Sequence, residues 1–262
     1  MAGLCFLAAC NNDLFGLFGS GDLAVRPESR DSFKFLSDTD RTLSLGTDYS
    51  FIVLTDTHIE EGDAHGLERL ASRLNGASFV VFTGDITQCG YREDVEKFIA
   101  VARSLNVPCY PVIGNHDVYF GNWREWKELI GSTRYRVEAG SASLFFLDSA
   151  NAFFGKDQLD WLERGVKAAR ARNQRVFVFS HVNLFVESPV DIQQFTDTRE
   201  RARITSMLKG RCDAMFTGHI HKRLVKNLGG VNYITIEDYR SHRTYCRVTV
   251  SSGGISWQFE KL

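Results

Sequence analysis

The sequence predicts an α/β fold with two mixed sheets flanked by helices, arranged as a four-layer α/β/β/α sandwich. Three observations support this prediction. Short, continuous apolar runs, typical of strands covered on both faces, recur along the chain from residue 51. Helical patterns separate these runs, as they do in the βαβ units of a largely parallel sheet. After residue 228, the remaining segments alternate apolar and polar residues, as antiparallel strands do.

The predicted strands are rich in Val, Phe and Ile, and their lengths suit buried strands. They are FIVLTD (51–56), FVVFTGD (79–85), CYPVIG (109–114), SLFFLD (143–148), RVFVFSH (175–181) and DAMFTGH (213–219). The alternating segments that we expect to form further, antiparallel strands are residues 231–238, 243–252 and 254–262.

The intervening helices are predicted from apolar residues at helical spacing. In residues 91–105, for example, Val95, Phe98 and Ala102 fall on one face. Asp157 is expected to cap the N-terminus of a later helix. We expect no helix after residue 228. The full set of predicted helices is residues 66–75, 91–105, 157–172 and 199–208.

Length and composition favour one large domain. The chain has 262 residues, of which 44% are hydrophobic and 24% are charged, and this is enough for a substantial core. Residues 11–48 are interpreted as a tether and lead-in segment, and residues 49–262 as the domain itself. The formal net charge of −1 offers no basic field for nucleic acid, which we therefore do not expect as a partner.

Residues 1–10 end in Leu7, Ala8, Ala9 and Cys10 after a short apolar run, and small residues before a cysteine resemble the lipobox of bacterial lipoproteins. The resemblance implies cleavage before Cys10, a lipid on that cysteine and attachment to the bacterial cell envelope. No other membrane contact is expected. Because the run is short and no Lys or Arg precedes it, the alternative is a plain apolar N-terminus on a cytoplasmic protein.

Polar side chains follow five of the predicted strands at the point where each strand ends. Ligands of an open α/β sheet bind at the carboxyl ends of its strands, so we expect these side chains to meet at one edge. Each strand end alone is weak evidence for a functional site, because polar residues after a strand usually serve as caps or in turns. The whole set, in this order along the chain, is much more specific evidence for such a site. The strand ends are Asp56-Thr57-His58, Gly84-Asp85, Gly114-Asn115-His116-Asp117, His181 and Gly218-His219-Ile220-His221.

Carboxylate, amide and imidazole groups in one place suit divalent cations such as Mn, Fe, Zn or Ni. No thiolate accompanies them, because Cys89, Cys109, Cys212 and Cys246 are scattered without a C-x-x-C pair, and we expect these cysteines to be buried small side chains. The ligands are too many for one tetrahedral ion. Two ions about 3.5–4 Å apart that share a bridging carboxylate would use them all and would clamp a phosphoryl group.

From Phe51 to His221 the sequence resembles the calcineurin-like metallophosphoesterase superfamily. The resemblance implies a binuclear metal centre in which Asp85 bridges the two ions. The first ion would be held by Asp56, His58, Asp85 and His221, and the second by Asp85, Asn115, His181 and His219.

The GNHD motif supplies the predicted catalytic groups. By the same resemblance, His116 would contact the phosphate and help protonate the leaving oxygen, and Asp117 would hydrogen-bond the His116 imidazole and hold its orientation. Asn115 would lie at the substrate as well as at the metal, and Gly114 would let the chain turn sharply. Arg223, soon after the last ligand, could bind a phosphate oxygen, with a salt bridge as the alternative.

Within the superfamily, the stretch GDITQCGYREDVEKFIAVARSLNVPCYPVIGNHD (84–117) looks most like the cyclic-nucleotide phosphodiesterase-type branch. Purple acid phosphatases are similar, but they place a metal-binding tyrosine where this chain has Gln88. Tyr91, one helical turn further on, is expected to pack instead. Aromatic residues in 119–129 could form a substrate wall, although core packing is the default for such a pattern on a short helix.

These expectations converge on a di-metal phosphoesterase that hydrolyses a small phosphate ester, a diester or else a monoester, by attack of a metal-bound hydroxide at phosphorus. Two alternatives stay open: a surface lipoprotein that binds metal or phosphate without turnover, and a nuclease of the same superfamily. The presence of His116 and of the full ligand set argues against the first, and the balanced charge argues against the second.

His65 and His242, away from the strand ends, are expected to be surface residues. The oligomeric state does not follow from the sequence.

Overall fold

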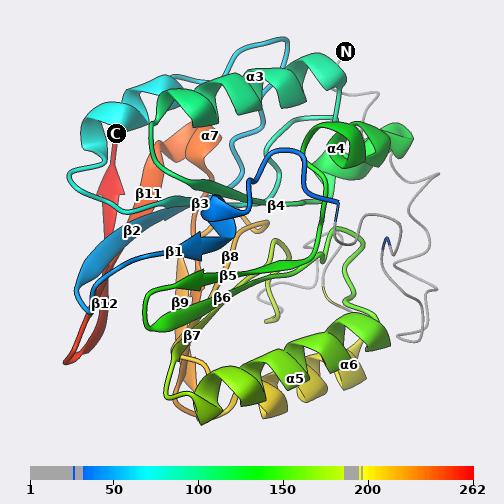
Figure 1. The fold of residues 1–262 in the computed structure, drawn as a ribbon. Coiled ribbons are helices and arrows are strands. Elements are labelled where there is room, and N and C mark those ends of the chain that lie inside the picture. Colours follow the sequence, from blue (N-terminus) through cyan, green and yellow to red (C-terminus); the bar gives the residue numbers. More distant parts are fainter. Residues whose placement is uncertain (1–25, 27–31, 186–194, 196) are drawn as a thin grey trace.

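The computed structural model describes Arg26, residues 32–185, Phe195 and residues 197–262. Two sheets lie face to face in the middle of the molecule, and helices cover the outer face of each (Figure 1). The α/β/β/α sandwich expected from the sequence is therefore confirmed. The lipobox-like segment 1–10, with Cys10, lies outside the described residues.

One sheet is built from five strands: β2 (Tyr49–Leu54), β3 (Val80–Thr83), β4 (Cys109–Val112), β11 (Thr244–Ser251) and β12 (Gly254–Lys261). Their order across the sheet is β12-β11-β2-β3-β4. β2, β3 and β4 run parallel, whereas β11 pairs antiparallel with both β2 and β12. This sheet is therefore mixed, as predicted.

The other sheet is built from seven strands: β1 (Thr42–Leu43), β5 (Tyr135–Ala139), β6 (Ala142–Phe146), β7 (Arg175–Phe179), β8 (Ala214–Thr217), β9 (Leu224–Leu228) and β10 (Val231–Thr235). Their order is β1-β5-β6-β7-β8-β10-β9. β6, β7, β8 and β10 run parallel, while β5 and β9 are antiparallel to their neighbours β6 and β10. This sheet is also mixed.

Helices form the two outer layers. The α-helices are α3 (Arg92–Ser104), α4 (Trp123–Leu129), α5 (Lys156–Ala171), α6 (Thr198–Leu208) and α7 (Tyr239–His242). The 3-10 helices are η2 (Thr39–Arg41), η3 (Leu67–Arg73) and η4 (His116–Gly121). Figure 1 shows α3 and α4 over the five-stranded sheet, and α5 and α6 over the seven-stranded sheet.

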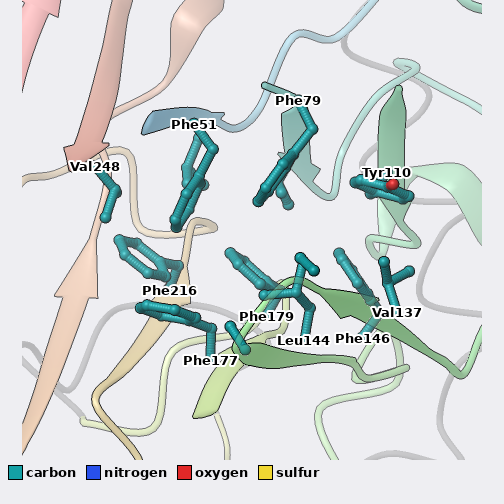
Figure 2. Packing of buried hydrophobic residues seen from close by; sticks show 14 of the residues in the cluster. Phe51, Phe79, Tyr110, Val137, Leu144, Phe146, Phe177, Phe179, Phe216 and Val248 are labelled. Carbon is teal, nitrogen blue, oxygen red and sulfur yellow. The ribbon is translucent and has the colours of Figure 1, made fainter. Parts of the chain in front are cut away.

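Aromatic side chains fill the space between the two sheets (Figure 2). Phe51 of β2 stacks on Phe79 with ring centroids 4.7 Å apart, and it meets Phe177 and Phe216 of the facing sheet edge-on. All four rings are fully buried. Two further apolar clusters join each sheet to its own helices. Because the strands have apolar neighbours on both faces, their sequences are continuous apolar runs.

Two predicted helices differ in detail from expectation. Within the predicted helix 66–75, residues Leu67–Arg73 form the 3-10 helix η3, and Gly66 before it lies in the left-handed region at φ 75°. The predicted cap, Asp157, is wrong, because α5 begins after Gly155 and Asp157 lies in the first turn. There its carboxylate accepts a hydrogen bond from Arg134 at 2.7 Å.

The C-terminal part departs from the all-antiparallel prediction. β10 pairs in parallel with β8, because the chain leaves β8, forms β9 and returns as β10 in an antiparallel hairpin. α7 occupies a region where no helix was expected. Its cap is Asp238, whose side chain accepts a hydrogen bond from Ser241 N at 2.8 Å. Four helical residues give too little periodicity to be detected in a sequence.

The described part of the lead-in segment, residues 32–48, packs on the domain. β1 extends the seven-stranded sheet at its edge by pairing in parallel with β5. Leu36 is buried in the core between the sheets, and Phe33 packs edge-on against Tyr135 with ring centroids 6.2 Å apart. This part of the segment is therefore an edge element of the fold.

The four cysteines after the N-terminal segment, Cys89, Cys109, Cys212 and Cys246, are buried and free, as expected. Burial raises the pKa of the Cys109 thiol to about 12, so this side chain stays protonated and behaves as a small apolar group. Within the described ranges, none of the helices has the length and apolar character needed to cross a membrane.

The stacked position of Phe51 leads to a stability prediction. Phe51→Ala removes a ring held between two sheets and should lower the free energy of unfolding by about 3–5 kcal/mol. Urea denaturation followed by circular dichroism measures the change. Leu228→Ala is the control, because Leu228 is 48% exposed and its loss should change stability by less than about 0.5 kcal/mol. Equal effects of the two substitutions would contradict the proposed core.

Candidate metal centre

The carboxyl ends of β2, β3 and β4 of one sheet, and of β7 and β8 of the other, meet at one edge of the sandwich. His219 N, after β8, donates to the Asp56 carboxylate, after β2, at 3.0 Å and so joins the two sheets there. Within the seven-stranded sheet, Gly218 N donates to the His181 carbonyl at 2.9 Å. All of the predicted metal ligands therefore come together. They are Asp56 and His58 after β2, Asp85 after β3, Asn115 after β4, His181 after β7, and His219 and His221 after β8.

Asp56, His58 and His221 form one group of donor atoms. Oδ1 of Asp56 lies 3.2 Å from Nε2 of His221 and 3.7 Å from Nε2 of His58. The two imidazole nitrogens are 3.4 Å apart. Ligand atoms that each lie about 2.1 Å from one ion, at angles of about 90–125°, are separated from one another by about 3.0–3.7 Å. These three atoms therefore have the spacing of ligands around a single cation.

A second group forms around His181. Its Nε2 lies 3.1 Å from Oδ2 of Asp85 and 3.0 Å from Oδ1 of Asn115. His219 meets the His181 ring edge-on, and its donor atom lies within 4.8 Å of those of Asp85 and His181. Nδ1 of His181 donates to the Thr83 carbonyl at 2.8 Å, so Nε2 is the nitrogen that faces the group.

Asp85 lies between the two groups. Its Oδ2 is also 4.0 Å from Nε2 of His58 and 3.9 Å from Nε2 of His116, while its Oδ1 accepts a hydrogen bond from His116 N at 2.9 Å. A carboxylate in this position can be shared by two ions. The donor set of carboxylate, amide and imidazole fits borderline divalent cations, so the residues present fit the pair of metals that the sequence implied.

The buried carboxylates and imidazoles of the site shift one another's pKa values. Burial alone would raise the pKa of Asp85, but the neighbouring imidazoles, His181 above all, hold it below its usual range. Burial also opposes a charge on His181, yet Asp85 raises the pKa of His181 to about 9. Likewise, hydrogen bonds from His221 and His58 overcome burial and lower the pKa of Asp56. The carboxylates are therefore ionised at neutral pH, and a cation that binds here displaces protons from imidazoles.

Five of the predicted ligands have a left-handed backbone conformation. Non-glycine residues at positive φ are uncommon, and such conformations cluster at functional sites because the surrounding structure must enforce them. Here each turn redirects a side chain from the end of a strand into the common centre. The residues are Asp56 (φ 52°), His58 (45°), Asp85 (48°), His219 (75°) and His221 (52°).

Two glycines allow the ligand segments to approach one another. A Cβ on Gly114 would lie 2.1 Å from Asp85 N and 2.3 Å from Asp85 Oδ1, and a Cβ on Gly218 would lie 2.5 Å from Asp56 Oδ2. No side chain can be accommodated at such distances. Gly114 is therefore required for space, and not for the sharp turn that the sequence suggested.

The predicted hydrogen bond between Asp117 and the His116 imidazole is wrong. Nδ1 of His116 donates instead to the Gln88 carbonyl, at 2.9 Å. The Asp117 carboxylate is buried away from that ring, and it accepts hydrogen bonds from Thr87 N and Thr87 Oγ1, both at 2.8 Å, and from Gly114 N at 2.9 Å. Asp117 ties the loop after β3 to the loop after β4, so its effect on His116 is indirect.

The contact of Arg223 with a phosphate oxygen stays a prediction. Its Nη2 forms an ion pair with Oε1 of Glu237 at 2.6 Å, and its guanidinium lies 4.1 Å from the ring centroid of Phe259. These two partners hold the side chain at the start of β9. The salt bridge, which was the alternative expectation, is what the structure contains.

The two remaining histidines differ in their surroundings. Nε2 of His65 donates to the His58 carbonyl at 3.0 Å, and its other ring nitrogen lies 3.2 Å from Asp63, so this residue supports a ligand loop and is not simply solvated. His242 is half-exposed and pairs with Asp238 at 2.7 Å, as expected for a surface residue.

Gln88 occupies the position of the purple acid phosphatase tyrosine. Its carbonyl accepts the hydrogen bond from His116, and its side chain accepts one from Arg240 at 2.9 Å. Arg240 also pairs with Glu60 at 2.7 Å. Sequence reasoning missed Arg240, because it comes after the motifs and in an unpredicted helix. Tyr91, which was expected to pack, is 46% exposed at the start of α3.

The aromatic stretch 119–129 divides between the site and the core. The Tyr119 ring lies 4.5 Å, centroid to centroid, from the His116 ring. Trp126 is 1% exposed and packs in the cluster between the five-stranded sheet and its helices, with Trp123 partly buried against the same cluster. The tryptophans therefore follow the default of core packing, and Tyr119 is the aromatic residue of this stretch that contacts His116.

The close approach of Gly114 to Asp85 leads to a prediction about metal binding. Gly114→Ala must displace Asp85, so we expect the metal-stripped variant to bind Mn²⁺ at least about tenfold more weakly by calorimetry. Gly46→Ala is the matched control, because a Cβ there meets nothing within 4 Å. Unchanged Mn²⁺ affinity in a folded Gly114→Ala variant would show that Asp85 does not belong to the site.

Two curated relatives are similar in sequence to part of this chain. A curated relative from Arcobacter nitrofigilis, described as a probable glycerophosphodiester phosphodiesterase (GpdQ), is 30% identical over 159 residues, which are 55% of this chain and 56% of the relative. A probable cyclic nucleotide phosphodiesterase from Fibrobacter succinogenes is 26% identical over 168 residues, 59% of this chain and 62% of the relative. These alignments thus span a little over half the length of the curated relatives. Both relatives are named as phosphodiesterases, in agreement with the predicted branch.

Solved structures share the fold. A dimetal phosphatase from Danio rerio superimposes with a TM-score of 0.67 at 13% identity, over 80% of this chain and 95% of that one. A purple acid phosphatase from yellow lupin superimposes with a TM-score of 0.68 at 12% identity, over 84% of this chain and 52% of that one. The family model of the calcineurin-like phosphoesterases matches residues 49–223, which contain all of the converging ligands. The chain therefore belongs to the calcineurin-like phosphoesterase family.

Proposed function

We propose that this chain hydrolyses phosphodiester bonds in small phosphate esters with the help of two divalent metal ions. The observation that carries the proposal is the position of Asp85 between two groups of donor atoms, with the His116 imidazole beside it. A single structural ion would need neither a second donor group nor a half-buried imidazole next to the shared carboxylate.

The proposed ligands divide into two sets that share Asp85. Two bound ions would supply charge that clamps the phosphoryl oxygens and makes a coordinated water acidic. Mn, Fe, Zn and Ni all suit this donor chemistry. The first set is Asp56, His58, Asp85 and His221, and the second is Asp85, Asn115, His181 and His219.

His116 is proposed to serve the leaving group. Because the Gln88 carbonyl can only accept, Nδ1 of His116 must carry its hydrogen, and Nε2 is the nitrogen turned toward the centre, 3.9 Å from Asp85. The side chain is 18% exposed, compared with 4% for His58, so it lies toward the open side of the site. Because Nδ1 already carries a hydrogen, a second proton on Nε2 makes the ring an imidazolium, and burial lowers the pKa of His116 so that this form gives up its proton readily. The Nε2 proton can then pass to the departing oxygen and leave a neutral imidazole, and a positioned acid of this kind accelerates such a step by about 10²–10⁴-fold.

The preference for diesters rests on the similarity to the two curated relatives, which are named as glycerophosphodiester and cyclic nucleotide phosphodiesterases. Neither name fixes the substrate of this chain. A small diester is consistent with the balanced charge, because a net charge of −1 gives the protein no overall attraction for a polyanion. Monoester hydrolysis at the same centre is the closest competing activity.

The function is tested with metal-stripped protein reloaded with Mn²⁺ and assayed on bis(4-nitrophenyl) phosphate, 4-nitrophenyl phosphate and cyclic AMP. We expect turnover of a diester that depends on Mn²⁺. Asp85→Asn and His116→Ala should each lower kcat by about 100-fold or more. His242→Ala is the control, because that histidine is paired with Asp238 at the surface.

Three results would contradict the proposal in different ways. Turnover that survives Asp85→Asn would place the chemistry elsewhere. Cleavage of the monoester alone would overturn the diester preference. Tight phosphate binding without hydrolysis of any ester would favour a binding protein over an enzyme.

A further inference from the structure

Tyr119 follows the GNHD motif and returns toward it. The chain leaves helical geometry at this residue (φ −57°, ψ 148°), and Phe120 then turns into the left-handed region at φ 57°. As a result, the Tyr119 side chain reaches back to two residues of the motif. Its hydroxyl accepts a hydrogen bond from Nδ2 of Asn115 at 3.1 Å, and its ring centroid lies 4.5 Å from that of His116 at an interplanar angle of 45°.

The contact with Asn115 holds the amide in place with its oxygen toward the metal centre. An amide can bind a cation through its oxygen but not through its NH₂ group, so a flipped Asn115 would present donors to the site. With Nδ2 bonded to the Tyr119 hydroxyl, Oδ1 points into the donor group, 3.0 Å from Nε2 of His181. Outer hydrogen bonds of this kind orient the ligands of metal sites.

The contact with His116 restrains the plane of the imidazole. Three neighbours define its position: the Gln88 carbonyl holds Nδ1, His58 meets the ring edge-on with centroids 4.6 Å apart, and the Tyr119 ring packs against it. The hydrogen bond to Gln88 fixes the position of Nδ1, and the rings of His58 and Tyr119 limit rotation of the imidazole about that bond. Loss of the Tyr119 ring would leave His116 with a support on one side.

We infer that Tyr119 is a positioning residue for metal binding and for protonation of the leaving group: its hydroxyl holds the Asn115 amide at the metal centre, and its ring restrains the plane of His116. The inference rests on the proposed function. It does not require the phenol to touch the substrate. The departure from helical geometry at Tyr119 and Phe120, directly after the GNHD motif, is what brings the Tyr119 side chain to these two residues.

The two roles are separated by two substitutions. Tyr119→Phe keeps the ring and removes the hydroxyl, so metal-stripped protein titrated with Mn²⁺ in a calorimeter should show one of two sites weakened by about tenfold. Its kcat should fall by a similar factor, while KM changes by less than about twofold. Tyr91→Phe is the matched control, because Tyr91 is an exposed tyrosine at the start of α3.

Tyr119→Leu removes the ring as well and tests the support of His116. Bis(4-nitrophenyl) phosphate has a good leaving group that needs little protonation, whereas diphenyl phosphate has a poor one. If Tyr119 positions the proton donor, the loss of kcat relative to Tyr119→Phe should be larger for diphenyl phosphate, by about tenfold. A general loss of structure would lower both rates by the same factor.

The outcomes distinguish this inference from the proposed function. If the wild-type protein binds Mn²⁺ but cleaves no ester, the function fails, and the Mn²⁺ affinity of Tyr119→Phe still tests the role of the hydroxyl. If the wild-type protein is active and Tyr119→Phe matches it in Mn²⁺ affinity and kcat, the inference is overturned and the function stands. Should Tyr119→Leu unfold at the assay temperature, Tyr119→Phe alone decides.

Discussion

The carboxylate of Asp85 lies where the two sheets and their terminal loops come together. It is buried, and a buried charge is tolerated in a protein only when it is paired and hydrogen-bonded. Here His181 approaches from one sheet, His58 and His116 from the other, and His116 N donates to Oδ1. The site therefore depends on the packing of the two sheets against each other, which brings their strand ends together around the two carboxylate oxygens of Asp85.

That arrangement is held by groups that bind no metal. Asp117 joins the loops after β3 and β4 through Thr87 and Gly114, and it is the backbone amides that fix the position of its carboxylate. The left-handed turns at the ligands are unfavourable by themselves, and the aromatic core between the sheets supplies the rigidity that maintains them. The apolar interior holds the strands in place, and the strand ends in turn position the metal-ligand side chains.

The fold and the ligands could be predicted because both depend on features that a sequence displays directly. Runs that are apolar on both faces indicate buried strands, and polar residues directly after several such runs must share an edge when the strands are parallel. The partners of His116 and Asp117 could not be predicted, because they depend on the path of the loop around Gln88. The contacts of Tyr119 and Arg223 could not be decided from the sequence for a similar reason, because local backbone angles set the direction of a side chain beyond a strand end.

The central claim is that Asp85 is shared by two cations, and anomalous diffraction from crystals of the Mn²⁺-loaded protein tests it most directly. We expect two manganese peaks about 3.5–4 Å apart, with the Asp85 carboxylate between them. One peak alone, or two peaks that lie away from Asp85, would contradict the claim.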